Sequence, residues 1–247
     1  MSEGLFVNEG KEAVVRSGSE SFRCYAIKTH VVTAEDSLAD VVETYAKPHL
    51  IEGDILFISE KMVACTEGRA ILMASIKPGF LARFLCKFVT KSSVGIGLGI
   101  PQTMQCALDE CGVFRILLAS AVGVLGKILG RKGWFYHVAG YRARSIDGPC
   151  DYTIPPYNKY VVLGPLNPEG TAKELAAQLP GVVVLIVDVN DLGLNILGAS
   201  APFDEKKLFD LLRQNPLGQA GESTPMGILR PEPVSDRESD PEPNPEQ

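Results

Sequence analysis

Two acidic segments of the sequence could bind a metal ion or a phosphate group. Asp188, Asn190 and Asp191 directly follow the apolar run 182–187, and Asp147 lies in an I-D-G-P turn. Carboxylate and amide oxygens suit magnesium or manganese, and magnesium usually takes one or two carboxylates together with nucleotide phosphates. The residue types alone leave two interpretations open for each segment, a solvated turn or a cation site.

Two further polar segments could contact a nucleotide. Lys28, Thr29 and His30 interrupt an otherwise apolar stretch, where the lysine either faces water or contacts a phosphate or ribose. Glu60 and Lys61 follow the next apolar run. Because polar groups after a strand are common ligand positions, both segments are candidate nucleotide contacts.

A glycine-rich loop near the C-terminus is a third candidate contact. Gly218, Gln219, Gly221 and Glu222 lie in it, and its backbone N–H groups could hold an anion. The chain has no G-x-x-x-x-G-K-[ST] phosphate loop, so any nucleotide site must be built differently.

The elements that must position these residues follow from apolar spacing and turn residues. We expect helices at 36–45, 78–91, 101–111, 167–179 and 204–214. We expect strands at 24–32, 54–59, 113–118, 134–139, 161–163, 182–187 and 226–229. Irregular alternation of helices and strands, with long loops, favours an α+β fold with mixed sheets and packed helices.

Composition limits the classes of partner. The chain has 247 residues, 45% hydrophobic content and a net charge of −6. Most of that charge lies in an acidic, proline-rich tail, 231–247, which we expect to be disordered. The remainder is almost neutral, so we expect no nucleic-acid partner. The apolar stretch 116–129 is shorter than the roughly 20 residues of a membrane span, so we expect a buried core segment and no membrane partner.

The domain organisation expected from the sequence is simple. Residues 1–20 are polar and should form a flexible lead-in, and 21–230 should form the folded domain. The six cysteines form no C-x-x-C motif, and no secretory signal is visible, so we expect reduced thiols and a cytoplasmic protein.

Five motifs, in order, resemble the coenzyme F-420 γ-glutamyl ligases. They are GDILFISEKMVACTEGRA, IDGP, GPLNPEGTAKEL, VDVNDLG and NPLGQAGESTP. The resemblance covers roughly residues 23–230. It implies a γ-glutamyl-ligase-like α+β fold without a Walker phosphate loop, which forms an intertwined homodimer.

The resemblance also implies an activity. Such ligases attach L-glutamate to a carboxylate of a deazaflavin precursor, using GTP or ATP and Mg²⁺ or Mn²⁺, through an acyl phosphate. By position, Lys28, Thr29, His30, Glu60 and Lys61 would line the nucleotide.

The same resemblance assigns the other candidate residues. The loop of Gly218, Gln219, Gly221 and Glu222 would also contact the nucleotide. Asp147 and Asp188 would bind the metal.

Within the segment that follows the apolar run 182–187, one position departs from the family's pattern. Val189 stands where the family has threonine, so Asn190 or Asp191 would have to supply the missing oxygen. Two alternatives remain open, a folate-elongating glutamate ligase and a non-catalytic relative that binds a nucleotide or cofactor.

Overall fold

The computed structural model describes residues 4–89, 96–131, 133–190, 193–218 and 221–232. Its strands are β1 (Val14–Ser17), β2 (Glu20–Ile27), β3 (Ile55–Ser59), β4 (Ala70–Leu72), β5 (Tyr160–Val162), β6 (Val183–Asn190), β7 (Gly193–Ala199) and β8 (Met226–Glu232). Its α-helices are α1 (Leu38–Tyr45), α2 (Glu60–Thr66), α3 (Phe80–Leu85), α4 (Pro101–Cys111), α5 (Val113–Ile128), α6 (Trp134–Ala139), α7 (Tyr141–Arg144), α8 (Pro168–Ala176) and α9 (Glu205–Leu212). Four 3₁₀ turns complete the set, η1 (Lys47–His49), η2 (Met73–Ser75), η3 (Cys86–Phe88) and η4 (Tyr157–Lys159).

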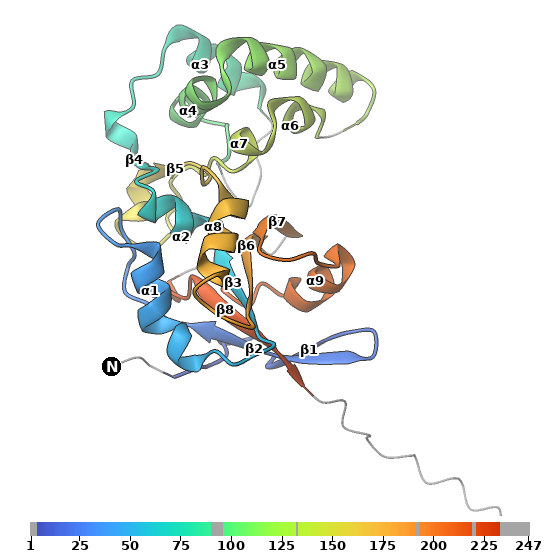
Figure 1. The fold of residues 1–247 in the computed structure, drawn as a ribbon. Helices are drawn as coiled ribbons and strands as arrows, with labels where there is room; N and C mark the ends of the chain where they lie inside the picture. Colours follow the sequence, from blue (N-terminus) through green and yellow to red (C-terminus); the bar gives the residue numbers. More distant parts are fainter. Residues whose placement is uncertain (1–3, 90–95, 132, 191–192, 219–220, 233–247) are drawn as a thin grey trace, which may run out of the picture.

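Six strands form one mixed sheet in the order β1-β2-β8-β3-β6-β7, and β4 pairs with β5 separately. Strands β3 and β6 are parallel, with Ser59 opposite Val187, whereas β8 is antiparallel to both of its neighbours. The carboxyl ends of β3 and β6 therefore reach the same edge of the sheet. The predicted α+β class with mixed sheets is confirmed (Figure 1).

Both faces of the central strands are covered, which explains their almost continuous apolar sequence. Leu56 and Ile58 of β3 face a core shared with α1 and α8. Phe57, between them, faces a second core that includes Leu208 and Leu211 of α9. Figure 1 shows α8 and α9 on either side of β6.

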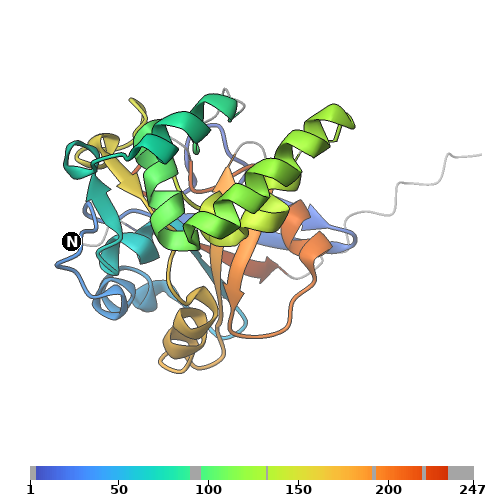
Figure 2. The ribbon, with the colours of Figure 1, turned by 90° about the horizontal axis from the view of Figure 1, so that it is seen from above.

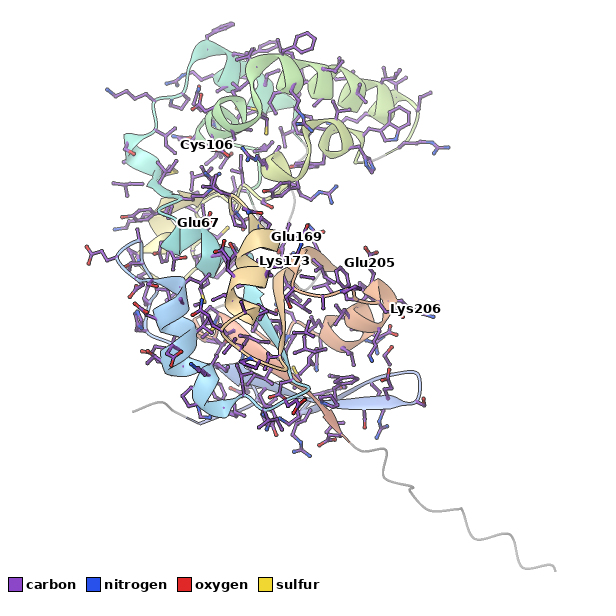
Figure 3. The ribbon with its side chains drawn as sticks, viewed as in Figure 1. Glu67, Cys106, Glu169, Lys173, Glu205 and Lys206 are labelled. Carbon is purple, nitrogen blue, oxygen red and sulfur yellow. The ribbon has the colours of Figure 1, made fainter. Side chains whose placement is uncertain are left out.

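Helices α3 to α7 form a helical lobe at one end of the sheet (Figure 1), and Figure 2 shows these helices from above, in front of the sheet. Its core includes Leu98, Met104 and Ile116, together with Val161 of β5. Cys106 of α4, labelled in Figure 3, lies in the same core.

Several helices begin where their sequences predict. The side chains of Ser37, Asn167 and Asp204 accept hydrogen bonds from backbone N–H groups in the first turns of α1, α8 and α9, which is how such residues stabilise helix starts. Glu169 and Lys173, labelled in Figure 3, form an exposed i,i+4 ion pair along α8. The helices predicted at 36–45, 101–111, 167–179 and 204–214 are confirmed.

Two predicted strands are wrong, because 113–118 and 134–139 lie in α5 and α6. A short apolar run does not distinguish a strand from a helix. The spacing that mattered is longer: Ile116, Ala119, Gly123 and Gly126 fall on one side of a helix, and Gly112 at φ 83° separates it from α4.

The segment 116–129 is also not the buried core segment that we expected. Ile116, Ala119 and Gly126 are its buried residues in α5, and most of its large side chains are exposed. Among the described residues, no single helix is long and apolar enough to cross a membrane, although α4 and α5, bent by 117°, pass that test as a pair.

The expectation of a flexible lead-in does not hold for all of residues 1–20. Val14–Ser17 forms β1, and the Asn8 side chain is buried, donating to Pro216 O at 2.8 Å and to Thr224 Oγ1 at 3.0 Å. At the other end, β8 includes the first two residues of the predicted tail. Residues 233–247 lie outside the described residues.

Candidate functional site

A cavity of about 670 Å³ opens between the helical lobe and the edge of the sheet at which β3 and β6 end. Segments far apart in the sequence line it. Most of the candidate residues are among them, namely Thr29, His30, Lys61, Asp147, Asp188, Asn190, Gly218 and Glu222. Lys28, Glu60 and Gly221 are described but do not line the cavity, and Asp191 and Gln219 lie outside the described residues.

The parallel pairing of β3 with β6 brings Lys61 and Asp188 together. Lys61 lies in the first turn of α2, directly after β3, and Asp188 follows the residue opposite Ser59 in β6. Asp147 is positioned separately, because its backbone pairs with Val162 of β5 in an isolated antiparallel bridge. The Lys61 Nζ to Asp147 Oδ2 distance is 2.8 Å.

Negative charge is concentrated beside this lysine. Burial raises the pKa of Asp188, and Asp147 raises it further, whereas Lys61 and a hydrogen bond from Asn190 lower it. Burial and the same two aspartates raise the pKa of Glu60 well above its usual value. The Lys61 side chain is about half exposed; the partial desolvation lowers its pKa, but the surrounding carboxylates outweigh this effect and the net shift is upward. Lys61 and Arg144, which also lowers the pKa of Asp188, offset part of the charge of these three acids, and the raised carboxyl pKa values favour a further positive charge.

The donor atoms present fit a hard cation. Asp147, Asp188 and Asn190 all line the cavity and offer oxygen atoms, and Glu60 Oε2 is buried with no hydrogen-bond partner among the described residues. No group of three or more His, Cys, Asp and Glu side chains in the described part of the chain is arranged to hold a metal. Such a cation would therefore need further oxygens from a substrate or water, which is how magnesium is commonly bound.

The sequence of the matched region decides the family. The F420-0:gamma-glutamyl ligase family model matches residues 26–191, about two thirds of the chain. This chain belongs to that family. It is also 28% identical over 179 residues to an uncharacterised protein of Methanocaldococcus jannaschii, an alignment that covers 68% of this chain and 58% of the relative. The chain thus spans little more than half the length of that relative.

The match to the gamma-glutamyl ligase family includes four of the five candidate segments. The glycine loop at 218–222 lies beyond it. In the structure this loop borders the cavity through Gly218, whose φ is 78° and whose added Cβ would lie 2.5 Å from the Glu222 carboxylate carbon. The positive φ of Gly218 therefore favours glycine, and a larger residue there would also displace the Glu222 carboxylate.

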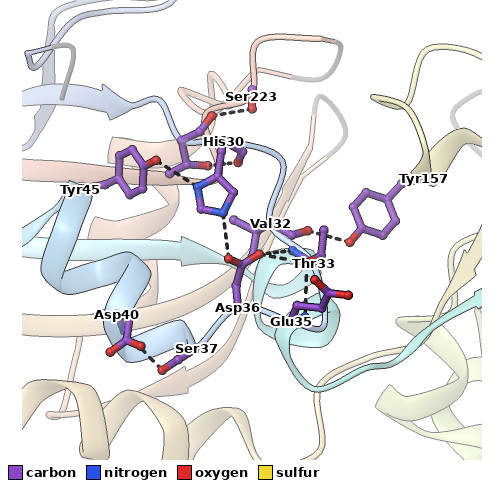
Figure 4. Close-up of polar contacts among 11 residues, drawn as sticks. His30, Val32, Thr33, Glu35, Asp36, Ser37, Asp40, Tyr45, Tyr157 and Ser223 are labelled. Atoms are coloured by element: carbon purple, nitrogen blue, oxygen red, sulfur yellow. Dashed lines mark hydrogen bonds and ion pairs between the residues drawn. The ribbon is translucent and has the colours of Figure 1, made fainter. Parts of the chain in front are cut away.

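The loop 28–33 of this ligase family member follows β2, rather than lying within a strand as we expected. Backbone and side-chain hydrogen bonds join Thr29 to Ser223, each at 3.0 Å. The His30 ring lies between Tyr45 and Asp36, with Nδ1 and Nε2 each 3.0 Å from their oxygens (Figure 4). His30 is thus fixed at the cavity wall by α1 and its preceding turn.

Part of the cavity wall was not predicted from the sequence. Tyr136, Arg144, Tyr152 and Tyr157 all line it, and Tyr157 Oη donates to Val32 O at 2.6 Å (Figure 4). A hydrogen bond with Cys150 and burial raise the pKa of Tyr152 to about 12. The tyrosines in the turn-rich segment 145–157 were the available signal, because aromatic residues are unusual in a purely solvated loop.

Proposed function

We propose that this cavity binds GTP or ATP and that the protein joins L-glutamate to a carboxylate of a deazaflavin precursor. The observation that supports this proposal best is the convergence of Lys61, Asp147 and Asp188 in the wall of the cavity, within the region that matches the gamma-glutamyl ligase family. The cavity volume is in the range of small-molecule and nucleotide sites. Family membership supports glutamate ligation, and the nucleotide, metal and acceptor belong to the proposal.

The proposed reaction has two steps. A carboxylate oxygen of the acceptor attacks the γ-phosphorus of the nucleotide, and the bond to the nucleoside diphosphate breaks. The glutamate amine then attacks the acyl carbon, phosphate leaves, and the nitrogen loses a proton. Both steps need charge neutralisation around a phosphoryl group more than covalent help from the protein.

Each residue of the constellation has a task in this scheme. Lys61 and Arg144, which both line the cavity, offset phosphate charge. Asp147 and Asp188, with the Asn190 amide, would hold Mg²⁺ or Mn²⁺. When bound, this cation would supply Lewis-acid neutralisation of the phosphates. Asp191 would assist as a further oxygen donor.

The cavity wall and the loops around it have the remaining tasks. Thr29, His30, Gly218 and Glu222 border the cavity near the hydrogen bonds that join Thr29, after β2, to Ser223, and they would position the nucleotide. Tyr152 and Tyr157 would cover the acceptor and exclude water, which protects an acyl phosphate from hydrolysis.

The test is product analysis with the full chain. Incubation with GTP or ATP, Mn²⁺, glutamate, and deazaflavin or folate acceptors should give an acceptor heavier by one glutamyl residue, with one phosphate released for each. Asp188→Asn should lose at least about a hundredfold in rate, since a ligand that stabilises phosphoryl charge is removed. Asp151→Asn is the control, because Asp151 is exposed, lies in the loop after Asp147 and does not line the cavity. Equal background phosphate release by wild type and Asp188→Asn would reject the ligase.

A second candidate is a relative that binds a nucleotide or cofactor without turnover. Val189 favours it, because this apolar side chain lines the cavity directly beside Asp188 where a hydroxyl oxygen is expected. Calorimetric titration with the nucleotide distinguishes the ligase from the non-catalytic binding protein. Tight nucleotide binding that is unchanged by removing divalent metal, with no product, would support the binding protein. A folate acceptor that gains glutamate would instead indicate folate elongation.

A further inference from the structure

A second cavity, of about 630 Å³, adjoins the first one. Its walls come from α6, α7, the start of α8 and strand β7, and Figure 1 places α6 and α7 above α8 and β7. Three residues, Tyr136, Arg144 and Asn195, line both cavities and so form the boundary between them. Apart from Arg144, no described residue that has a role in the proposed reaction lines the second cavity, so that reaction leaves it without a ligand.

Asn195 places this boundary beside the candidate metal site. In the antiparallel pairing of β6 with β7, Asn195 is directly opposite Asp188. Side chains of directly opposite residues project from the same face of a sheet, with Cβ atoms about 4.5–5.5 Å apart. The charge of Arg144 also reaches this site, because it lowers the pKa of Asp188. A group held at the boundary from the second cavity is therefore next to the part of the first cavity that Asp188 lines.

Hydrogen bonds and close packing hold the walls of the second cavity in place. Tyr141 Oη of α7 donates to Pro165 O at 2.9 Å, and Arg115 Nε of α5 donates to Val138 O of α6 at 2.8 Å. On the opposite side, β7 lies against the start of α8, where an added Cβ on Gly198 would collide with the first residue of that helix. The cavity is therefore formed before a ligand binds, which lowers the entropic cost of binding.

The polar groups that line the second cavity favour a carboxylate as its ligand. Arg144 and His137 line it, and Arg144 forms no hydrogen bond or ion pair within the described part of the chain. Glu169 is the one acid among the described residues of the wall, and it is paired with Lys173 at 2.5 Å. An arginine without an ion pair can bind a carboxylate through two parallel hydrogen bonds, and the Asn195 amide adds a neutral donor at the same boundary.

The proposed reaction also needs a place for its third substrate. The first cavity, of about 670 Å³, has to hold the nucleotide and the acceptor together, and the amine of the amino acid must reach the acyl phosphate that forms there. A cavity that adjoins the first one and binds a carboxylate meets this need, because the amino acid can bind while the first cavity is full.

We infer that the second cavity binds the amino-acid substrate, L-glutamate, by its carboxylate groups. Arg144 binds one carboxylate at the boundary, and His137 supplies a further hydrogen bond from the wall. The amine then lies beside Asn195, next to the acyl phosphate in the first cavity. The identity of the amino acid rests on the proposed function, whereas the choice of a small carboxylate rests on the cavity alone.

The test measures the binding of L-glutamate to the full chain, in the assembly that it forms in solution, by ligand-observed NMR. The titration is made with and without GDP and Mg²⁺, so that no turnover takes place. Wild type should bind L-glutamate in at least one of these conditions. Arg144→Met should weaken this binding by about tenfold or more, because a charge-assisted pair of hydrogen bonds to the carboxylate is lost.

Arg142→Met is the matched control, because Arg142 is an exposed arginine of the same helix that lines neither cavity. This variant should bind L-glutamate like wild type. His137→Leu separates the two cavities, because His137 lines the second and not the first. It should weaken L-glutamate binding by about fivefold and leave the affinity for GDP unchanged. Circular dichroism of each variant should show an unchanged fold.

Two results of the titration would overturn the inference. One is that wild type does not bind L-glutamate in either condition, as expected if a second copy of the chain fills this cavity. The other is that wild type, Arg144→Met and His137→Leu bind it equally. Binding that depends on both residues, without any glutamyl product, would support this site and reject the proposed ligase. Formation of the product by His137→Leu with an unchanged KM for L-glutamate would instead support the ligase and reject this site.

Discussion

Replacing Arg230 should reveal how strongly a buried ion pair holds the centre of the sheet. Arg230 of β8 contacts Asp54, directly before β3, in a bidentate arrangement, with Nε–Oδ1 at 2.8 Å and Nη2–Oδ2 at 2.7 Å. Nη2 also donates to His49 O at 2.8 Å. Asp54 is fully buried, whereas the Arg230 side chain is 23% exposed.

Because Asp54 is fully buried and Arg230 is partly exposed, substitutions of the two residues should differ in their cost to the free energy of unfolding. Arg230→Met leaves a fully buried carboxylate that still accepts a hydrogen bond from Ile51 N, at 3.0 Å. An uncompensated charge of this kind costs about 3–5 kcal/mol of the free energy of unfolding. Asp54→Asn leaves the arginine partly hydrated, still bonded to His49 O and able to donate to the amide oxygen. We expect this change to cost about 1–2 kcal/mol.

Urea unfolding, followed by circular dichroism, measures both values and their coupling. For a domain of this size each kcal/mol corresponds to roughly 2–4 °C in melting temperature, so Arg230→Met should melt about 6–20 °C below wild type. Arg230→Met/Asp54→Asn should be more stable than Arg230→Met alone, because the amide no longer buries a charge. If Arg230→Met costs no more than Asp54→Asn, the reasoning from burial is refuted.

Three further predictions address the core, the site and the thiols. Gly227→Ala should cost about 3 kcal/mol in urea unfolding, since its Cβ would lie 2.3 Å from the Phe57 ring; an unchanged midpoint would contradict this packing. In metal-free buffer, the raised pKa of Glu60 gives stability that is present at low pH and lost as pH rises through the folded-state value. Glu60→Gln should therefore flatten that decline between pH 5 and 8 in urea titrations, and an unaltered slope would count against it. Burial raises the pKa of the Cys24 thiol to about 12, so a thiol reagent at pH 8 should modify Cys150, which lines the cavity, well before Cys24; mass mapping that finds Cys24 modified first would be the contrary result.

Local sequence signals gave much of the fold, because they depend on a few neighbouring residues. Caps such as Ser37 and Asn167 marked helix starts, and the apolar run 182–187 marked the central strand. The strand extends to Asn190, because β7 pairs with its polar end. Pairing with a later strand has no local signal, so neither β7 nor the extension was predicted.

The candidate site was likewise predicted only in part from the sequence. Residue types pointed to Asp147, Asp188 and Lys61 as chemically capable groups, since carboxylates and lysines near strand ends often contact ligands. Their shared environment, with its perturbed carboxyl pKa values, depends on the parallel pairing of β3 with β6 and on the bridge that holds Asp147. The nucleotide, metal and acceptor roles of these residues stay predictions.

The sequence by itself determined the elements with clear caps or spacing, the membership of a ligase family, and the residue types available for chemistry. The tertiary structure decided which of these residues face one another, and that α5 turns its large apolar side chains outward. The physical reason is that capping and periodicity involve residues a few positions apart. Strand pairing, burial and the contact of α5 with α6 join segments whose separation along the chain carries no such signal.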